Sequence, residues 1–206
     1  MGLSGLFLCV YLVVHLAGNL MLLKKDGGVL FNQYAMYMEH FWVTQILEVV
    51  LFLGFFIHII DGIILTFQNK SARPVKYAVN NPSENSSWFS RNMGFTGSIV
   101  FFFLIVHLKN FFIDQRFFEK HSSMYQAALD VFSNPYYALL YVFAIAVLGL
   151  HLNHGFQSAF QSIGFNHPRY TRWLKLFGTL YAIIIPVGFI IIPIYLSFCG
   201  GMSCPH

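Results

Sequence analysis

Charged residues are scarce in this 206-residue chain: 10% are Asp, Glu, Lys or Arg, whereas 57% are hydrophobic. A soluble domain with so few charges could not cover its surface, so the composition argues against an ordinary water-soluble protein. Cysteine is scarce too, and none of the three forms a Cys-x-x-Cys or Cys-x-x-Cys-His arrangement. Covalent c-type haem attachment and cysteine-ligated zinc or iron–sulfur sites therefore have no support.

The apolar residues lie in five long runs, each near the length of about 20 residues that a helix needs to cross a bilayer core. The runs are Leu3–Leu23, Phe41–Phe67, Gly94–Ile113, Tyr136–Phe160 and Trp173–Phe198. They are too long for the roughly ten-residue alternating strands of a membrane barrel. The sequence therefore predicts one all-α integral membrane domain over residues 1–206, with five transmembrane helices.

Lysine and arginine collect in two of the four connections between these runs. The second connection holds Lys70, Arg73, Lys76 and Arg91 against one acid, and the fourth holds Arg169 and Arg172 with no acid. The positive-inside rule predicts that both connections face the cytoplasm, with the N-terminus inside and the C-terminus outside. The net charge of +4 then reflects topology. No basic stripe or recognition helix indicates nucleic-acid binding.

An internal repeat relates four histidines within the runs. Nine residues separate Met1-Gly2-Leu3-Ser4-Gly5 from His15, and nine separate Met93-Gly94-Phe95-Thr96-Gly97 from His107. His58 and His151 each precede a Gly by four residues, a Phe by nine and a Gln by ten. A two-helix unit therefore occurs twice in the same membrane orientation, and the fifth helix stands outside it.

Depth in the membrane pairs the same histidines. His15 and His107 lie about 10 Å below the outer surface, and His58 and His151 about 14 Å from the cytoplasmic side, at 1.5 Å per residue. Two imidazoles at one level suit axial ligation of a haem, which supplies its other four ligands, whereas zinc needs further protein ligands. The sequence predicts two b haems, with His15 and His107 holding the outer iron and His58 and His151 the inner one. The repeat decides against the neighbouring His154 as a ligand.

These motifs resemble the single-anchor, di-haem form of the cytochrome b subunit of succinate dehydrogenase and fumarate reductase. The resemblance rests on V-H-L at Val14–Leu16, H-I-I-D-G at His58–Gly62, V-H-L at Val106–Leu108, H-L-N-H-G-F-Q at His151–Gln157, N-K-S-A-R-P-V-K-Y at Asn69–Tyr77 and N-H-P-R-Y at Asn166–Tyr170. It covers essentially the whole chain. One departure is Gly149, where some members of the family carry a proton-conducting glutamate two residues before the fourth ligand.

The resemblance implies a complex in a bacterial cytoplasmic membrane. A flavoprotein subunit and an iron–sulfur subunit would dock on the cytoplasmic connections at Lys70–Arg91 and Arg169–Lys175. Electrons would pass between the iron–sulfur subunit and a quinone, usually menaquinone in di-haem members. The chain lacks a Gly-x-Gly-x-x-Gly fingerprint and a flavin-sized polar segment, so succinate chemistry would take place on a partner.

Quinone chemistry requires protons, so an ionisable group is expected near one haem. Glu48 lies within the second run, near the predicted level of the outer haem, and Glu39 lies at the outer mouth of the same helix. Intramembrane acids are functional by default, so Glu48 and Glu39 are the candidate proton relay. An equally weighted interpretation is that Glu48 pairs with a neighbouring helix. Lys109 is expected to meet a haem propionate or anionic membrane lipid.

Two rival functions remain open at this stage. A di-haem cytochrome b of another quinone-linked complex, such as a formate dehydrogenase or hydrogenase, would share the histidine pairs but receive its electrons on the outer side. A transporter or channel with parallel repeats would use the buried His, Asp and Glu residues as a proton path and bind no haem. The visible spectrum of the purified protein would distinguish a haem protein from the transporter or channel. Identification of the co-purifying partners would distinguish the two kinds of cytochrome b.

Overall fold

The structure, a computed structural model, describes residues 1–72, 88–165 and 167–199. Within these ranges the regular secondary structure is entirely helical, with no strand. Five helical segments there are long and apolar enough to cross a membrane: Gly2–Leu23, Trp42–Asn69, Met93–Arg116, Pro135–Ser162 and Pro168–Phe198. The prediction of an all-α chain with five helices long and apolar enough to span a membrane is confirmed for the described residues, and the fifth helix begins five residues earlier than predicted.

The five spans are built from the following elements. They are α1 (Gly2–Asn19) with the 3₁₀ turn η1 (Leu20–Leu23), α3 (Trp42–Ser71), α6 (Met93–Leu108) with the π-helical turn η2 (Lys109–Ile113) and α7 (Asp114–Arg116), α9 (Pro135–Ser162) and α10 (Pro168–Cys199). The short helix α5 (Trp88–Arg91) precedes α6. Helix α9 has a clear start signal, because Asn134 Oδ1 accepts a hydrogen bond from the Tyr136 N–H at 2.9 Å and Pro135 occupies the first turn.

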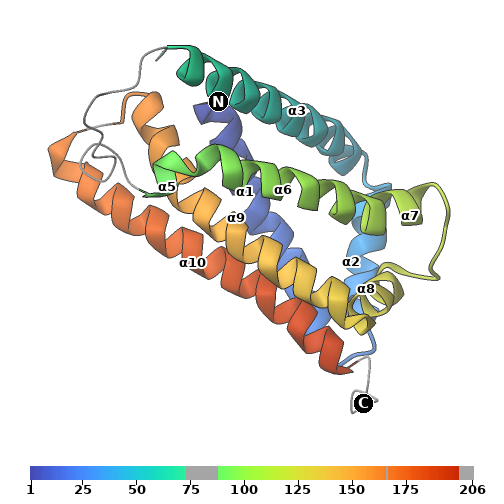
Figure 1. The fold of residues 1–206 in the computed structure, drawn as a ribbon. Helices are drawn as coiled ribbons and strands as arrows, with labels where there is room; N and C mark the ends of the chain where they lie inside the picture. Colours follow the sequence, from blue (N-terminus) through green and yellow to red (C-terminus); the bar gives the residue numbers. More distant parts are fainter. Residues whose placement is uncertain (73–87, 166, 200–206) are drawn as a thin grey trace.

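Four of the spans form a ring, and the fifth packs outside it (Figure 1). Helix α1 packs on α3, α3 on α6, α6 on α9, and α9 back on α1. The two diagonal combinations, α1 with α6 and α3 with α9, are not among the closely packed helix pairs of the described chain. Helix α10 packs mainly along α9 and also contacts α1. The ring therefore has two diagonals across which side chains, but not backbones, can meet.

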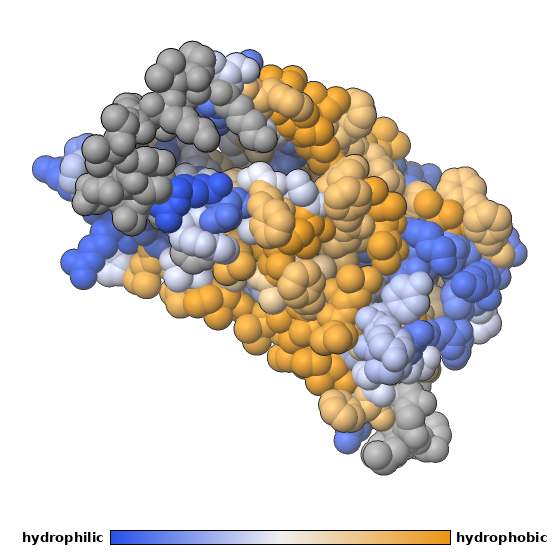
Figure 2. Space-filling model, viewed as in Figure 1, coloured by the Kyte–Doolittle hydropathy of each residue, from blue (hydrophilic) through white to orange (hydrophobic). Residues whose placement is uncertain are grey.

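Most of the buried apolar residues of the described chain belong to α1, α9 and α10. One cluster there contains Cys9, Leu16, Leu152, Phe156, Tyr181, Ala182 and Ile185. Close approach of α9 and α10 depends on a small residue, since a Cβ at Gly149 would lie 3.0 Å from the Ala182 carbonyl oxygen. Helix α3 has no buried residue in its most apolar window. Its outward faces belong to the apolar band that Figure 2 shows between two hydrophilic ends, as expected for a lipid-facing surface.

Two helices outside the spans were missed from the sequence, which treated their segments as loops. These helices, α2 (Val29–His40) and α8 (Met124–Ser133), pack together at one end of the bundle and form what we call the α2–α8 cap (Figure 1). Asp26 starts α2, because its carboxylate accepts hydrogen bonds from the N–H groups of Gly28 and Leu30 at 3.0 and 3.1 Å. The Tyr125 N–H of α8 donates a hydrogen bond to Asn32 Oδ1 of α2 at 3.0 Å. Burial raises the pKa of the Tyr125 hydroxyl.

Candidate functional site

Histidines meet across both diagonals of the ring. His15 of α1 and His107 of α6 form the α1–α6 pair, with ring centroids 5.9 Å apart and ring planes at 87°. His58 of α3 and His151 of α9 form the α3–α9 pair, with centroids 6.4 Å apart and planes at 78°. The structure thus brings together the same two combinations that repeat and depth predict. The two helices of each pair do not pack directly on each other, so the distance between the two histidines depends on how the four helices of the ring pack together.

The α3–α9 pair has matching polar surroundings at its two rings. Ser4 Oγ lies 3.3 Å from His58 Nδ1, and Thr96 Oγ1 lies 3.3 Å from His151 Nδ1. Glycine follows each hydroxyl residue. A Cβ at Gly5 would lie 3.5 Å from His58 Cε1, and one at Gly97 would lie 3.3 Å from His151 Cε1. Each ring of this pair therefore rests against a hydroxyl–glycine dipeptide from the preceding transmembrane helix.

The α1–α6 pair has unlike surroundings at its two rings. His15 Nδ1 lies 3.3 Å from both the Tyr11 hydroxyl and Asn19 Nδ2. His107 Nδ1 is buried and has no hydrogen-bond partner in the described chain. Phenyl rings flank His107 instead, with the Phe103 and Phe111 centroids 5.8 and 5.3 Å from its own. A buried, unpartnered ring nitrogen is uncommon and calls for a functional explanation.

The hydrogen bonding of the two ring nitrogens, Nδ1 and Nε2, shows which atom of each histidine is free to bind a metal. Three of the four histidines have a polar partner at Nδ1, and within the described residues no hydrogen bond engages Nε2 on any of the four. Metal-ligating histidines use one ring nitrogen for the metal and commonly donate the other to a neighbouring acceptor. The two imidazoles of each pair, whose Nε2 atoms have no hydrogen-bond partner among the described residues, could therefore hold a haem iron between them, and the haem would supply one-electron chemistry there.

The rival ligand His154 makes no such pair. It lies three residues beyond His151 on α9, and the structure gives it no hydrogen bond or ring contact with any described residue. The nearby polar side chains bind one another, because Asn153 Oδ1 accepts hydrogen bonds from Gln157 Nε2 at 3.1 Å and from the Thr179 hydroxyl at 3.2 Å. This polar group faces α10 rather than the α3–α9 pair.

The two acids expected near a quinone differ in their interactions. Glu39, near the end of α2, forms an ion pair with Arg116 of α7, with Oε1 and Nη1 2.7 Å apart. The Glu39 and Arg116 side chains are 54% and 45% exposed, so this bond lies at the surface. Glu48 of α3 is half-buried and forms no ion pair or hydrogen bond with the described residues. Among the described residues, neither acid forms a hydrogen bond or ion pair with a member of either histidine pair.

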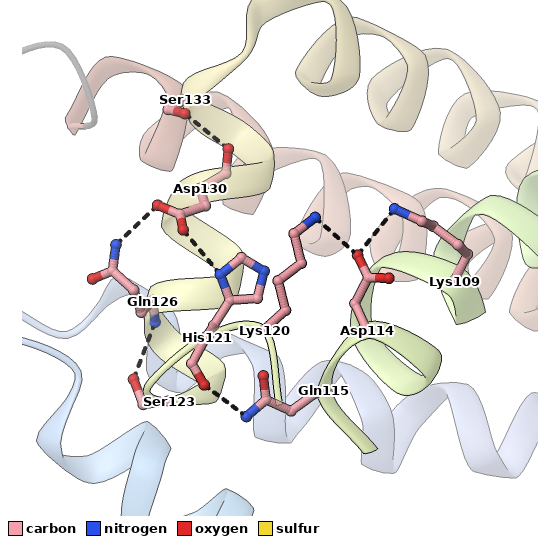
Figure 3. A network of polar contacts seen from close by, with 9 residues as sticks. All are labelled: Lys109, Asp114, Gln115, Lys120, His121, Ser123, Gln126, Asp130 and Ser133. Atoms are coloured by element: carbon pink, nitrogen blue, oxygen red, sulfur yellow. Dashed lines mark hydrogen bonds and ion pairs between the residues drawn. The ribbon is translucent and has the colours of Figure 1, made fainter. Parts of the chain in front are cut away.

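A polar network that the sequence did not reveal lies beside the α2–α8 cap (Figure 3). Lys109 and Lys120 both direct Nζ to Oδ2 of Asp114, at 2.9 and 3.2 Å, and the Asp114 side chain is only 11% exposed. Further along, His121 Nδ1 lies 2.9 Å from the Asp130 carboxylate. The sequence assigned Lys109 to a propionate or lipid and gave Asp114 no role. The network instead ties the end of the third span to the segment that leads into α8.

No group of three or more His, Cys, Asp or Glu side chains that could hold a bare metal ion occurs among the described residues. Two basic segments are predicted from the sequence to dock cytoplasmic partners. Lys70–Arg91 lies largely outside the described residues, whereas Arg169–Lys175 lies at the start of α10. Comparisons of the chain with protein-family models, curated proteins and solved structures gave no match. The function must therefore be argued from the two histidine pairs and the ring that holds them.

Proposed function

We propose that this chain is a di-haem cytochrome b that anchors a succinate dehydrogenase or fumarate reductase complex in the membrane. It transfers electrons between the iron–sulfur subunit of that complex and a quinone, with menaquinone as the proposed substrate. The observation that carries the proposal is the placement of two histidine pairs on the two diagonals of one four-helix ring. The motifs that resemble the cytochrome b subunit supply the identity of the complex.

The diagonal placement suits a flat macrocycle better than it suits a hydrogen-bonded histidine pair alone. Cofactor sites in helical bundles use side chains that project inward from facing helices. The α1–α6 and α3–α9 pairs provide two imidazoles each in that arrangement, and their Nε2 atoms have no other hydrogen-bond partner among the described residues. With haem bound at each pair, the chain would contain two one-electron centres between the two membrane surfaces. The protein residues would hold the centres in place and exclude water from them.

A parallel two-helix repeat is part of the same proposal, with α1 and α3 as one unit and α6 and α9 as the other. Its support is the correspondence of contacts as well as of sequence. A Cβ at Gly62 would lie 3.2 Å from Met1 Cε, and a Cβ at its counterpart Gly155 would lie 3.3 Å from Met93 Cε. The Ser4 and Thr96 contacts described above correspond in the same way. Each unit would carry one histidine on its first helix and one on its second. Duplication would then give one pair from the two first helices and another pair, at a different depth, from the two second helices.

Orientation and partners extend the proposal to the membrane surfaces. The basic segments Lys70–Arg91 and Arg169–Lys175 would face the cytoplasm and bind the iron–sulfur and flavoprotein subunits. The α2–α8 cap would then face the opposite side. Cross-linking of the intact complex should connect the hydrophilic subunits to residues at the start of α10. Cross-links to the α2–α8 cap instead would reverse the proposed orientation.

Haem content tests the central claim. A pyridine haemochrome assay on the purified complex should give two haems per chain. Replacing His15 or His107 with Ala should remove one spectral component, and replacing either member of the α3–α9 pair should remove the other. The matched control is His154→Ala, which should retain both haems because this neighbouring histidine lies outside the pairs. A colourless wild-type chain would refute the function and favour the transporter alternative, and one haem per chain would refute the two-pair assignment.

A further inference from the structure

The hydroxyl groups beside the α3–α9 pair have a fixed hydrogen-bonding direction. Ser4 Oγ donates its proton to the Met1 carbonyl oxygen at 2.9 Å. Thr96 Oγ1 lies 3.2 Å from the Asn92 carbonyl oxygen and 3.1 Å from that of Met93, so its proton is also used on the helix backbone. A hydroxyl carries a single proton, and its remaining lone pairs can only accept. Toward the neighbouring imidazole, each oxygen is therefore an acceptor.

This direction determines which nitrogen of each imidazole carries the proton. A neutral imidazole has one N–H and one unprotonated nitrogen. An acceptor beside Nδ1 favours the tautomer with hydrogen on Nδ1, which leaves the lone pair on Nε2. His58 and His151 are both in this situation, because Ser4 and Thr96 lie 3.3 Å from their Nδ1 atoms. Both rings of the pair are thus prepared to bind iron through Nε2.

We propose that Ser4 and Thr96 are positioning residues that hold His58 and His151 in the Nδ1–H tautomer and tune the haem between them. This proposal rests on the proposed function and adds to it a source of inequality between the two centres. The α1–α6 pair has no hydroxyl–glycine dipeptide at either ring, and His107 Nδ1 has no partner in the described chain. The chain therefore treats its two proposed haems differently at the level of ligand hydrogen bonding.

The expected effect follows from ligand basicity. An acceptor on Nδ1–H makes the imidazole a stronger donor to the metal, and loss of such a partner typically reduces metal affinity by about 10- to 100-fold. A stronger donor stabilises ferric iron more than ferrous iron. Removing either hydroxyl should therefore raise the midpoint potential of the α3–α9 haem and increase its rate of loss from the protein by about tenfold. The α1–α6 haem should be unaffected.

The experiment uses the purified complex and three kinds of variant. Ser4→Ala and Thr96→Val remove the hydroxyls, and Thr96→Val does so with little change in side-chain shape. Ser4→Thr and Thr96→Ser exchange the two residue types and keep the hydroxyls. Ser98→Ala is the matched control on α6, because the Ser98 hydroxyl donates to the Gly94 carbonyl oxygen at 2.9 Å and forms no hydrogen bond with a histidine of the described chain. Redox titration followed by visible spectroscopy gives each potential, and transfer to excess apomyoglobin in detergent gives each rate of haem loss.

Support for the proposal is a raised potential and faster loss of the α3–α9 haem in Ser4→Ala and in Thr96→Val. The exchange variants and Ser98→Ala should behave as wild type. A wild-type complex with two haems, combined with hydroxyl-deletion variants that match Ser98→Ala, would overturn the positioning role alone. A shift in the midpoint potential of the α1–α6 haem, with no shift for the α3–α9 haem, would also overturn the positioning role. Absence of haem from the wild type would refute the proposed function and this inference together.

Discussion

Gly28, at the start of α2, allows a direct test of how the α2–α8 cap packs. It has φ of +81°, and a Cβ at this position would lie 2.1 Å from Cγ of Tyr125. Its neighbour Gly27 has φ of +66°, but nothing lies within 4 Å of its Cβ position. Both glycines thus adopt a left-handed conformation, whereas only Gly28 is in contact with another helix. Alanine at the two positions separates backbone strain from steric overlap.

The two substitutions should differ in free energy by the cost of the overlap. A left-handed conformation costs a non-glycine residue about 1–2 kcal/mol, and this is the full expected loss of stability for Gly27→Ala. Forcing additional carbon into a packed interface costs about 1–3 kcal/mol more, because side chains and backbone must shift. Gly28→Ala should therefore lower the free energy of unfolding by about 2–5 kcal/mol.

Unfolding in mixed micelles, driven by SDS and followed by tryptophan fluorescence, measures both losses. In a Tyr125→Ala background, Gly28→Ala should cost about as much as Gly27→Ala does in the wild type, since the ring that the new methyl group meets is absent. Equal losses for Gly27→Ala and Gly28→Ala would show that the Tyr125 ring does not cover Gly28. The same result would refute the packing of α8 against the start of α2.

Three further predictions concern the acids. Under the proposed function, Glu48→Gln should impair quinone reduction while haem content and succinate oxidation with an artificial dye persist. Near-normal quinone turnover would exclude Glu48 and leave Glu39 as the candidate relay. A double-mutant cycle between Glu39 and Arg116 should give a coupling of about 0–1 kcal/mol, because both side chains are half exposed; a coupling well above that range would mean that the pair is shielded from solvent. Asp114→Asn should destabilise the chain by about 1.5–3 kcal/mol through loss of charged hydrogen bonds, measured by SDS unfolding against the exposed Asp130→Asn control; equal effects of the two changes would contradict the shared-carboxylate network.

The five spans were predictable because their signal depends on length and apolar composition alone. The two cap helices were not, since their mixed composition resembles that of a connection. A local signal for α8 was present, however. Ser123 is followed three residues later by Gln126, and the Ser123 hydroxyl accepts a hydrogen bond from the Gln126 N–H at 3.2 Å. This Ser-x-x-Gln spacing is a helix-start pattern that a search for membrane spans passes over.

The histidine combinations were also predictable, because depth along a straight helix follows from residue number. The partners of each Nδ1 atom were not. Ser4 and Thr96 stand out in the repeat as matching residues, but their contacts with the next helix depend on how far each helix is rotated about its axis. Likewise, Asp114 and its two lysines converge only after the π-helical turn Lys109–Ile113, where the sequence predicts an unbroken α-helix.

The proposed repeat relates the unlike surroundings of the α1–α6 pair to differences in sequence between its two units. An offset of 92 residues aligns Tyr11 with Phe103 and Asn19 with Phe111. In the first unit, these positions place a hydroxyl and an amide 3.3 Å from the histidine Nδ1. In the second unit, the same positions place two phenyl rings against the histidine, and its Nδ1 loses both polar neighbours. The Ser4 and Thr96 positions, in contrast, keep a hydroxyl in both units. Under the proposed duplication, the residues next to Nδ1 differ between the units at the α1–α6 pair and keep a hydroxyl at the α3–α9 pair, which would make the two sites chemically different.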